Sequence, residues 1–151
     1  MNAAGLTPSA NAPATRWEHF RHEADMGIRG LGPTPAAAFV QAALALTAVI
    51  CEPERVQPLE RVRILCVADD LEWLFVEWLD ALIYEMATRR MLFGRFEVEI
   101  EGSRLMADAW GEPIDVARHA PAVEVKGTTL TELAVRRAPD GSWVAQCVVD
   151  V

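Results

Sequence analysis

The segment from Leu71 to Arg90 constrains the fold of this chain more than any other stretch. Its large apolar side chains recur three and four residues apart, which is the spacing of one buried face of an α-helix. They are Leu71, Leu74, Phe75, Trp78, Leu79, Leu82, Ile83 and Met86. Asp69, with Glu72 three residues later, predicts a carboxylate cap at the start. The closing pair Arg89 and Arg90 suits the negative end of the helix dipole.

A second helix is predicted from Pro35 to Ile50, after a capping residue at Thr34. Proline is compatible with the first turn of a helix, and Pro53 ends the pattern. The segment PAAAFVQAALALTAVI is the most hydrophobic in the chain, but it is shorter than the roughly 20 residues that cross a bilayer. It also contains Gln41. We therefore expect a buried helix and no membrane association.

The other patterned segments predict strands. A first strand, RWEHFRHEA, ends at Asp25, and RVRILCVA, residues 61–68, is apolar and β-branched. From Gly94 the apolar period becomes two, and the residues EGS turn the chain into the second strand of a hairpin. Another hairpin joins residues 132–137 to SWVAQCVVD through the turn PDG. Two helices with six or seven strands in this order predict an α+β fold, in which the helices cover mixed or antiparallel sheets on one side.

Length and composition indicate a single soluble domain. A chain of 151 residues with 52% hydrophobic side chains supplies one core. Residues 1–15 are small, polar and proline-containing, so we expect a flexible tail there and a folded domain over residues 16–151. Residues 1–16 do not resemble a secretory signal, and the three cysteines form no CxxC pair. Buried reduced thiols and a cytoplasmic location are expected.

The charge balance bears on the kind of partner. Fourteen basic and twenty-two acidic residues give a formal net charge of −8, which repels phosphate backbones. This argues against direct binding of RNA or DNA. A basic protein partner or a bound cation suits the balance better.

The stretch HEADMGIRG places Asp25 at a corner just before Gly27. An ion ligand, a turn cap and a catalytic acid all fit this residue. His19 and His22 form an HxxH pair, but an odd separation on a strand directs the two rings to opposite faces, which disfavours zinc. The chain has no glycine-rich phosphate loop and no GxSxG motif, so catalysis by this chain alone is poorly supported.

The chain stays strand-like to its last residue, in WVAQCVVDV. Asp150 and the carboxylate of Val151 therefore concentrate negative charge near the sheet. If Asp25 lies alongside, three carboxylates converge, and their repulsion favours a hard cation with oxygen ligands, calcium or magnesium. A solvated chain end and an Asx turn at Asp25 explain the same residues.

Four segments follow one another between Arg16 and Val151: WEHFRHEADMGIRG, DDLEWLFVEWLDALIY, AWGEPIDVARH and WVAQCVVDV. Together they resemble the archease family, whose members are protein cofactors of RtcB-type RNA-splicing ligases. The resemblance implies an α+β domain of the SHS2-like type. It also implies a non-enzymatic activator that promotes metal- and GTP-dependent guanylylation of the ligase and its multiple turnover in tRNA splicing and RNA repair. RNA would be reached only through the ligase.

The resemblance also implies a metal site. Asp25 in HEADMG, and Asp150 with Val151 in the terminal DV, match the family's metal-binding positions, the last through its main chain or terminal carboxylate. One divalent cation is implied, with calcium as the usual assignment and magnesium or manganese as alternatives. Lys126 in VEVKGTT matches a family lysine near this acidic tip, placed to approach the nucleotide site of the ligase. A solvent-facing lysine on a strand is the alternative.

The chain departs from the family pattern directly after this lysine, where residues 127–129, GTT, replace alanine, threonine and tyrosine. Two other functions stay open. The acidic tip also suits a metal-dependent hydrolase or nucleotide-processing enzyme, and the domain suits a chaperone-like binding module. GEPIDVARH is either a loop capped by Asp115 or exposed partner-binding surface, and Trp73 is either an edge of the core or an interface anchor.

Overall fold

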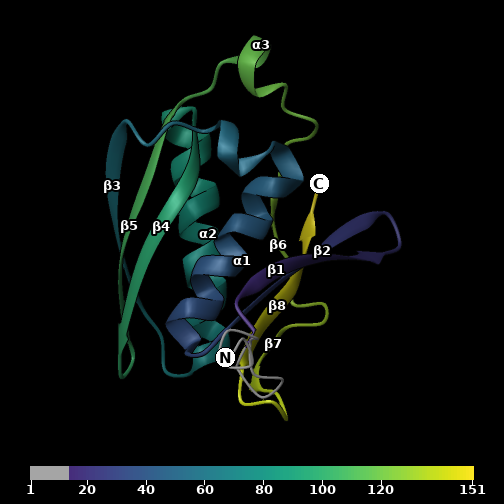
Figure 1. Cartoon of the computed structure of the whole chain (residues 1–151), viewed down its shortest axis with the longest axis vertical. Coiled ribbons are helices and arrows are strands. Elements are labelled where there is room, and N and C mark those ends of the chain that lie inside the picture. The colour runs from purple at the N-terminus through teal and green to yellow at the C-terminus, as the bar shows by residue number, and fades with distance from the viewer. Residues whose placement is uncertain (1–13) are drawn as a thin grey trace, which may run out of the picture.

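The computed structural model describes residues 14–151, in which two long helices lie between two antiparallel sheets (Figure 1). The larger sheet has the order β1-β2-β8-β6, with β7 also paired to β8, and the smaller has the order β3-β5-β4. The elements are β1 (Arg16–His22), β2 (Asp25–Gly32), α1 (Pro35–Ile50), the 3₁₀ helix η2 (Pro53–Arg55), β3 (Glu60–Val67), α2 (Leu71–Arg89), β4 (Met91–Glu101), β5 (Arg104–Pro113), α3 (Val116–His119), β6 (Gly127–Thr128), β7 (Ala134–Arg137) and β8 (Trp143–Asp150). The predicted α+β class is confirmed.

The structure describes only a small part of the predicted N-terminal tail. Of the predicted tail, residues 1–15, all but Ala14 and Thr15 lie outside the described residues. The first strand begins at Arg16, where the sequence places the start of the domain. Within residues 14–151 no helix is long and apolar enough to cross a membrane.

Helix α1 is buried on more than one side because it lies between the sheets. Thr34 caps it as predicted, since its Oγ1 accepts a hydrogen bond from the amide of Ala37 at 3.1 Å. Its alanines allow close approach of the larger sheet. A Cβ atom on Gly30 of β2 would lie 2.1 Å from the carbonyl oxygen of Ala38 and 2.3 Å from the amide nitrogen of Ala42. The backbones of β2 and α1 are therefore in direct contact.

Helix α2 carries the predicted apolar stripe, of which Leu71 and Ile83 are half-buried and the other members are buried. The predicted cap is wrong by one residue. Asp70, and not Asp69, accepts a hydrogen bond from the amide of Trp73 at 2.8 Å, because the helix begins at Leu71 and the acceptor must stand directly before it. The indole nitrogen of buried Trp78 donates to the carbonyl oxygen of Phe39, which joins the two helices.

Strand β2 is missing from the sequence-based prediction, which treats HEADMGIRG as a corner. Glycines 27, 30 and 32 give this strand a composition that is unusual for a β-sheet. Tertiary contacts explain them, because a Cβ atom on Gly27 would lie 2.3 Å from the ring of Phe20 and one on Gly32 would lie 2.6 Å from the Cβ of Ala37. With β2 and the short β6 included, the described residues contain eight strands.

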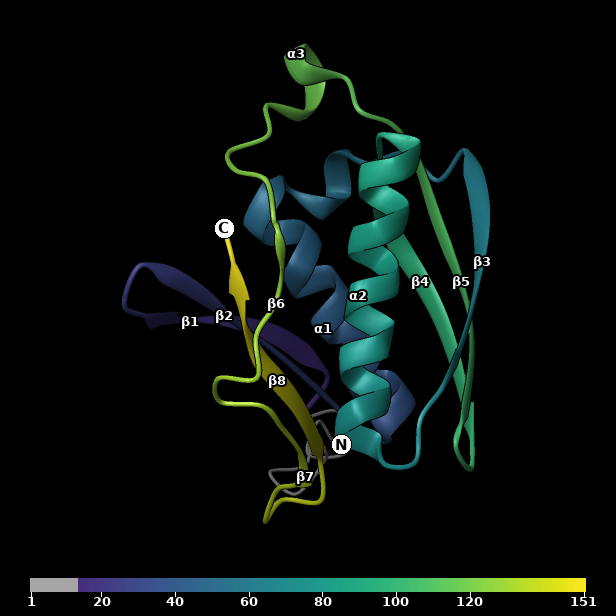
Figure 2. The same cartoon turned by 180° about the vertical axis from the view of Figure 1, so that it is seen from behind.

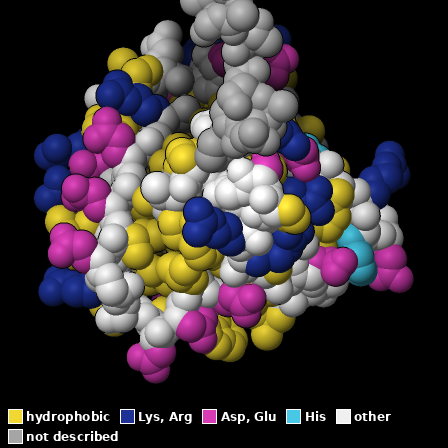
Figure 3. Space-filling model, turned by 60° about the horizontal axis from the view of Figure 1, so that its bottom comes forward, with side chains coloured by type: hydrophobic (Ala, Val, Ile, Leu, Met, Phe, Trp, Pro, Cys, Tyr) yellow, Lys and Arg dark blue, Asp and Glu magenta, His cyan; other side chains and the backbone are white. Residues whose placement is uncertain are grey.

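The two predicted hairpins are confirmed. Gly102 between β4 and β5 and Gly141 between β7 and β8 both adopt positive φ, of 58° and 91°. The outer face of the smaller sheet is solvated. Figure 3 shows basic and acidic side chains interspersed over this sheet, at the left-hand edge of the view.

Candidate metal-binding tip

Strand pairing brings the two predicted metal-binding segments to one end of the larger sheet. Strands β2 and β8 are antiparallel, and their ladder includes the pair Met26–Val149. Asp25 directly precedes Met26, and Asp150 directly follows Val149. The acidic residues therefore stand at the same end of the ladder, although they come from opposite ends of the folded chain.

Lys126 belongs to the same end of the sheet. Its amide donates a hydrogen bond to the carbonyl oxygen of Asp150 at 2.8 Å, and the next residue, Gly127, pairs with Asp150 in register. Seen from behind, the extended chain that leads into β6 runs beside the C-terminus (Figure 2). The sheet thus assembles Asp25, Asp150, Val151 and Lys126 at one tip, which we call the acidic tip.

The residues that depart from the family pattern support this arrangement. Thr129 donates its hydroxyl to the carbonyl oxygen of Val148 at 2.8 Å, which ties the chain after β6 to β8. Thr128 donates its hydroxyl to the carboxylate of Asp80 on α2 at 2.7 Å. The altered residues fix β6 between β8 and the helix layer, and so hold Lys126 beside Asp150.

Asp25 follows a tight turn between β1 and β2. His22 and Asp25 form the last cross-strand pair, and Glu23 between them adopts φ of 54°, which is strained for a non-glycine residue. Within residues 14–151 the carboxylate of Asp25 accepts no hydrogen bond. The turn-capping alternative therefore lacks a bond that would support it.

The side chains at the tip are oxygen donors of the kind that calcium and magnesium prefer. Asp25 is half-buried and Asp150 is exposed, so a small cation can reach both from solvent. In the described part of the chain, no three His, Cys, Asp or Glu side chains form a cluster that could hold a metal. A cation at the acidic tip would therefore need further oxygen ligands, from the main chain of Val151 or from water.

The histidines of the HxxH pair do not form a site. His19 donates its Nε2 proton to the carbonyl oxygen of Ala45 on α1 at 2.8 Å, whereas His22 lies beside the turn, with its Nδ1 3.9 Å from a carboxylate oxygen of Glu23. The cysteines Cys51, Cys66 and Cys147 are free and buried, as predicted. Burial raises the pKa of Cys66 to about 11 and that of Cys147 to about 12, so these thiols are poor metal ligands and nucleophiles.

Sequence reasoning missed a buried polar cluster at the end of β5. Glu112 is 3% exposed, and its carboxylate accepts hydrogen bonds from Arg118, from His119 and from the amide of Gln57. The amide of Asp115 donates to Nδ1 of His119, so the proton of that neutral ring is on Nε2, which faces Glu112. Except for Gln57, these residues belong to the segment GEPIDVARH, and Asp115 caps α3 as one interpretation of that segment expects. The cluster anchors α3 rather than forming an open site.

The fold and the tip define a class, a small α+β domain with oxygen donors gathered at one end of a sheet. The model of the archease protein family matches residues 17–151, and the chain belongs to this family. It is 39% identical over 140 residues to the protein archease of Pyrococcus furiosus, covering 90% of this chain and 99% of that one. It is 38% identical over 139 residues to the protein archease of Methanopyrus kandleri, covering 89% and 99%.

Two solved structures resemble this one. The solution structure of Methanobacterium thermoautotrophicum protein 1598 has a TM-score of 0.79 at 28% identity and covers 89% of this chain and 98% of that one. The crystal structure of a Thermotoga maritima archease, described as a possible chaperone, has a TM-score of 0.53 at 16% identity and covers 89% and 99%. The second likeness concerns the fold alone.

Proposed function

We propose that this chain is a non-enzymatic activator of an RtcB-type RNA ligase, which promotes metal- and GTP-dependent guanylylation of the ligase and its multiple turnover in tRNA splicing and RNA repair. The observation that carries the proposal is the register of β2, β6 and β8. It gathers Asp25, Asp150 and Lys126 at one exposed end of the sheet. Membership of the archease family supports the same role.

Each residue of the acidic tip has a part in this proposal. Asp25 and Asp150 hold one divalent cation, with calcium as the usual assignment. A main-chain or terminal oxygen of Val151 is a further ligand. When bound, the cation supplies a positive centre that attracts oxygen ligands. Lys126 adds a second positive charge at the acidic tip, where it approaches the nucleotide site of the ligase. The net charge of −8 keeps RNA away from this chain, so RNA is contacted through the ligase.

The experiment mixes the purified chain with the RtcB-type ligase of the same organism, GTP and a divalent cation. Guanylylation of the ligase and the number of RNA joints formed per ligase are measured. We expect stimulation of at least about tenfold and more than one joint per ligase. Asp25→Ala should abolish the stimulation without changing the fold, whereas Glu23→Ala, at the exposed turn next to it, should not.

Stimulation by Asp25→Ala equal to that of the unchanged chain would contradict the proposal. Turnover of nucleotide by this chain without ligase would favour the alternative, a metal-dependent hydrolase or nucleotide-processing enzyme that uses the same aspartates to position water. The two functions are therefore separated by omitting the ligase.

One observation favours a chaperone-like binding module as a second candidate. Large apolar side chains are exposed on several elements, among them Leu65, Val67 and Val116, which are 63%, 67% and 71% exposed. Suppression of aggregation of an unrelated unfolded protein, unaffected by chelation of divalent cations, would support this role. Loss of all activity on chelation would support the activator instead.

A further inference from the structure

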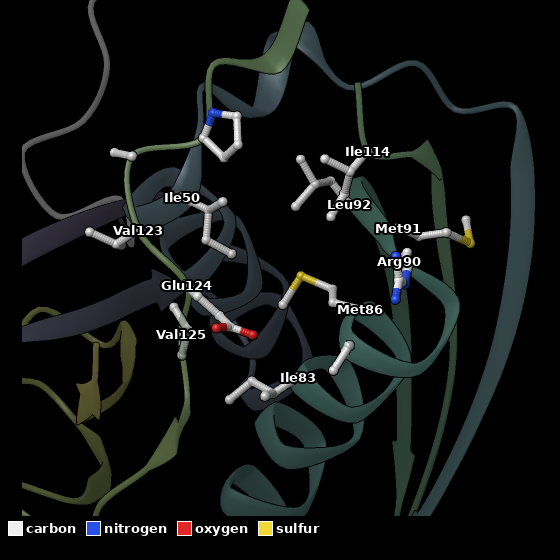
Figure 4. A pocket seen from close by; sticks show the side chains of 13 residues that line it. Ile50, Ile83, Met86, Arg90, Met91, Leu92, Ile114, Val123, Glu124 and Val125 are labelled. Atoms are coloured by element: carbon white, nitrogen blue, oxygen red, sulfur yellow. The ribbon is translucent and has the colours of Figure 1, made fainter. Parts of the chain in front are cut away.

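A cavity lies next to the acidic tip and has no part in the function proposed above. It has a volume of about 520 Å³ and lies between the ends of α1 and α2, the start of β4 and the extended residues 121–125 (Figure 4). Most of its lining residues are apolar, Ile50, Ile83, Met86 and Leu92 among them. The volume falls within the range of about 300 to 1,000 Å³ that is typical of ligand pockets.

Hydrogen bonds on both sides hold the cavity open. The amide of Ile114 donates to the carbonyl oxygen of Arg90 at 3.0 Å, and the amide of Ala122 donates to the carbonyl oxygen of Ile50 at 2.8 Å. Between these two points the chain passes through α3, which the buried Glu112 cluster anchors. Residues 121–125 are thus fixed at a distance from α2 and do not close over the apolar walls.

The cavity and the acidic tip share one stretch of backbone. Val125 is 6% exposed and lines the cavity, and the next residue, Lys126, donates its amide to Asp150 at the tip. The cavity wall and the acidic tip are thus one residue apart along the backbone, and we expect a protein bound at the tip to lie close to the cavity. The rim is apolar as well, because Ile114 and Val123 are 40% and 41% exposed.

The two charged residues of the cavity lie on opposite walls. Glu124 extends from residues 121–125 toward Met86, and Arg90 lies at the end of α2 beyond Met86 (Figure 4). An apolar side chain that enters between them would have a basic neighbour near Glu124 and an acidic or carbonyl group near Arg90. The net charge of −8 further favours a basic segment in the partner.

We propose that this cavity binds an apolar side chain of the partner ligase, from a surface segment that carries a basic residue next to that side chain. This inference rests on the proposed function. The acidic tip then acts on the nucleotide site of the ligase, and the cavity supplies an apolar anchor that holds the two proteins together. Buried apolar anchors of this kind contribute most of the affinity of many protein interfaces.

The first experiment measures the dissociation constant of the complex with the ligase of the same organism. Ala87 is exposed on α2 and lines the cavity, so Ala87→Trp fills the space with little effect on the core. Glu124→Lys reverses the charge of an exposed wall residue. We expect each variant to weaken binding at least about tenfold. Leu65→Trp, on the exposed face of β3, is the matched control and should leave binding unchanged.

The same variants separate this inference from the proposed function. Asp25→Ala should abolish stimulation of the ligase at every concentration, whereas Ala87→Trp should weaken binding and recover full stimulation at high concentration. Normal binding by both Ala87→Trp and Glu124→Lys, together with loss of stimulation in Asp25→Ala, would overturn the cavity inference alone. Failure of the unchanged chain to bind or stimulate the ligase would overturn both proposals.

A photo-crosslinking amino acid in place of Val123 identifies the occupant. Crosslinking to a ligase peptide that contains an apolar residue beside a lysine or arginine would support the inference. Crosslinking to a second copy of this chain, or no crosslinking in a complex that forms normally, would overturn it.

Discussion

Asp25 and Asp150 stand at the same end of the β2–β8 ladder, each one residue beyond the pair Met26–Val149. The hydrogen bond from the amide of Lys126 to the carbonyl oxygen of Asp150 adds a third strand to this end of the sheet. The acidic tip thus depends on tertiary structure, because its residues come from three separate segments of the sequence. Loss of any of the three strands would disperse it.

The contact between β2 and α1 predicts a strong effect of a very small substitution. In Gly30→Ala the new methyl group would lie 2.1 Å from the carbonyl oxygen of Ala38, which is a backbone atom and cannot rotate away. We expect the free energy of unfolding to fall by about 3 kcal/mol, as measured by denaturation in urea. Gly127→Ala is the control, because a Cβ atom there would meet nothing within 4 Å. Equal stability of the two variants would show that β2 does not pack on α1 as described.

The buried Glu112 predicts the response of stability to acid. The hydrogen bond from Arg118, followed by those from Gln57 and His119, holds the pKa of this carboxyl at about 2, below its usual value of 4.5, against the opposing effect of burial. A carboxyl with a lowered pKa in the folded state stabilises the fold above pH 4.5 and loses this contribution as the pH falls toward 2. We expect urea unfolding to show this loss in the unchanged chain. Glu112→Gln should be less stable at neutral pH and should lose less stability between these pH values, and an identical pH profile would argue against the cluster.

The buried cysteines predict low thiol reactivity. Burial raises the pKa of Cys51, of Cys66 to about 11 and of Cys147 to about 12, so almost no thiolate is present at neutral pH. A colourimetric thiol reagent at about pH 8 should label the native protein very slowly and all three cysteines once the protein is denatured. Rapid labelling of one thiol before denaturation would place that side chain at the surface.

The sequence predicted those elements whose local pattern agrees with their tertiary environment. The periodicity of α2, the Thr34 cap of α1 and the glycine turns of both hairpins are of this kind. Strand β2 escaped prediction because its glycines satisfy contacts with α1 and with Phe20, which no local rule encodes.

The candidate site likewise has a part that the sequence predicts and a part that it does not. The resemblance to the archease family selected Asp25, Asp150, Val151 and Lys126, and strand register shows that the segments that carry them meet. The cavity beside the tip could not be predicted, because its walls come from four separated parts of the chain. Hydrophobic periodicity indicates which residues avoid water, but it does not indicate where their packing is incomplete.

Calorimetric titration of calcium into the purified chain tests the central claim most directly, because it examines the acidic tip without the ligase. We predict that one ion binds per chain, that Asp25→Asn and Asp150→Asn each abolish binding, and that Glu23→Gln, in the turn beside Asp25, retains it. Calcium binding of unchanged strength in Asp25→Asn would contradict the account, because the ion would then be held elsewhere.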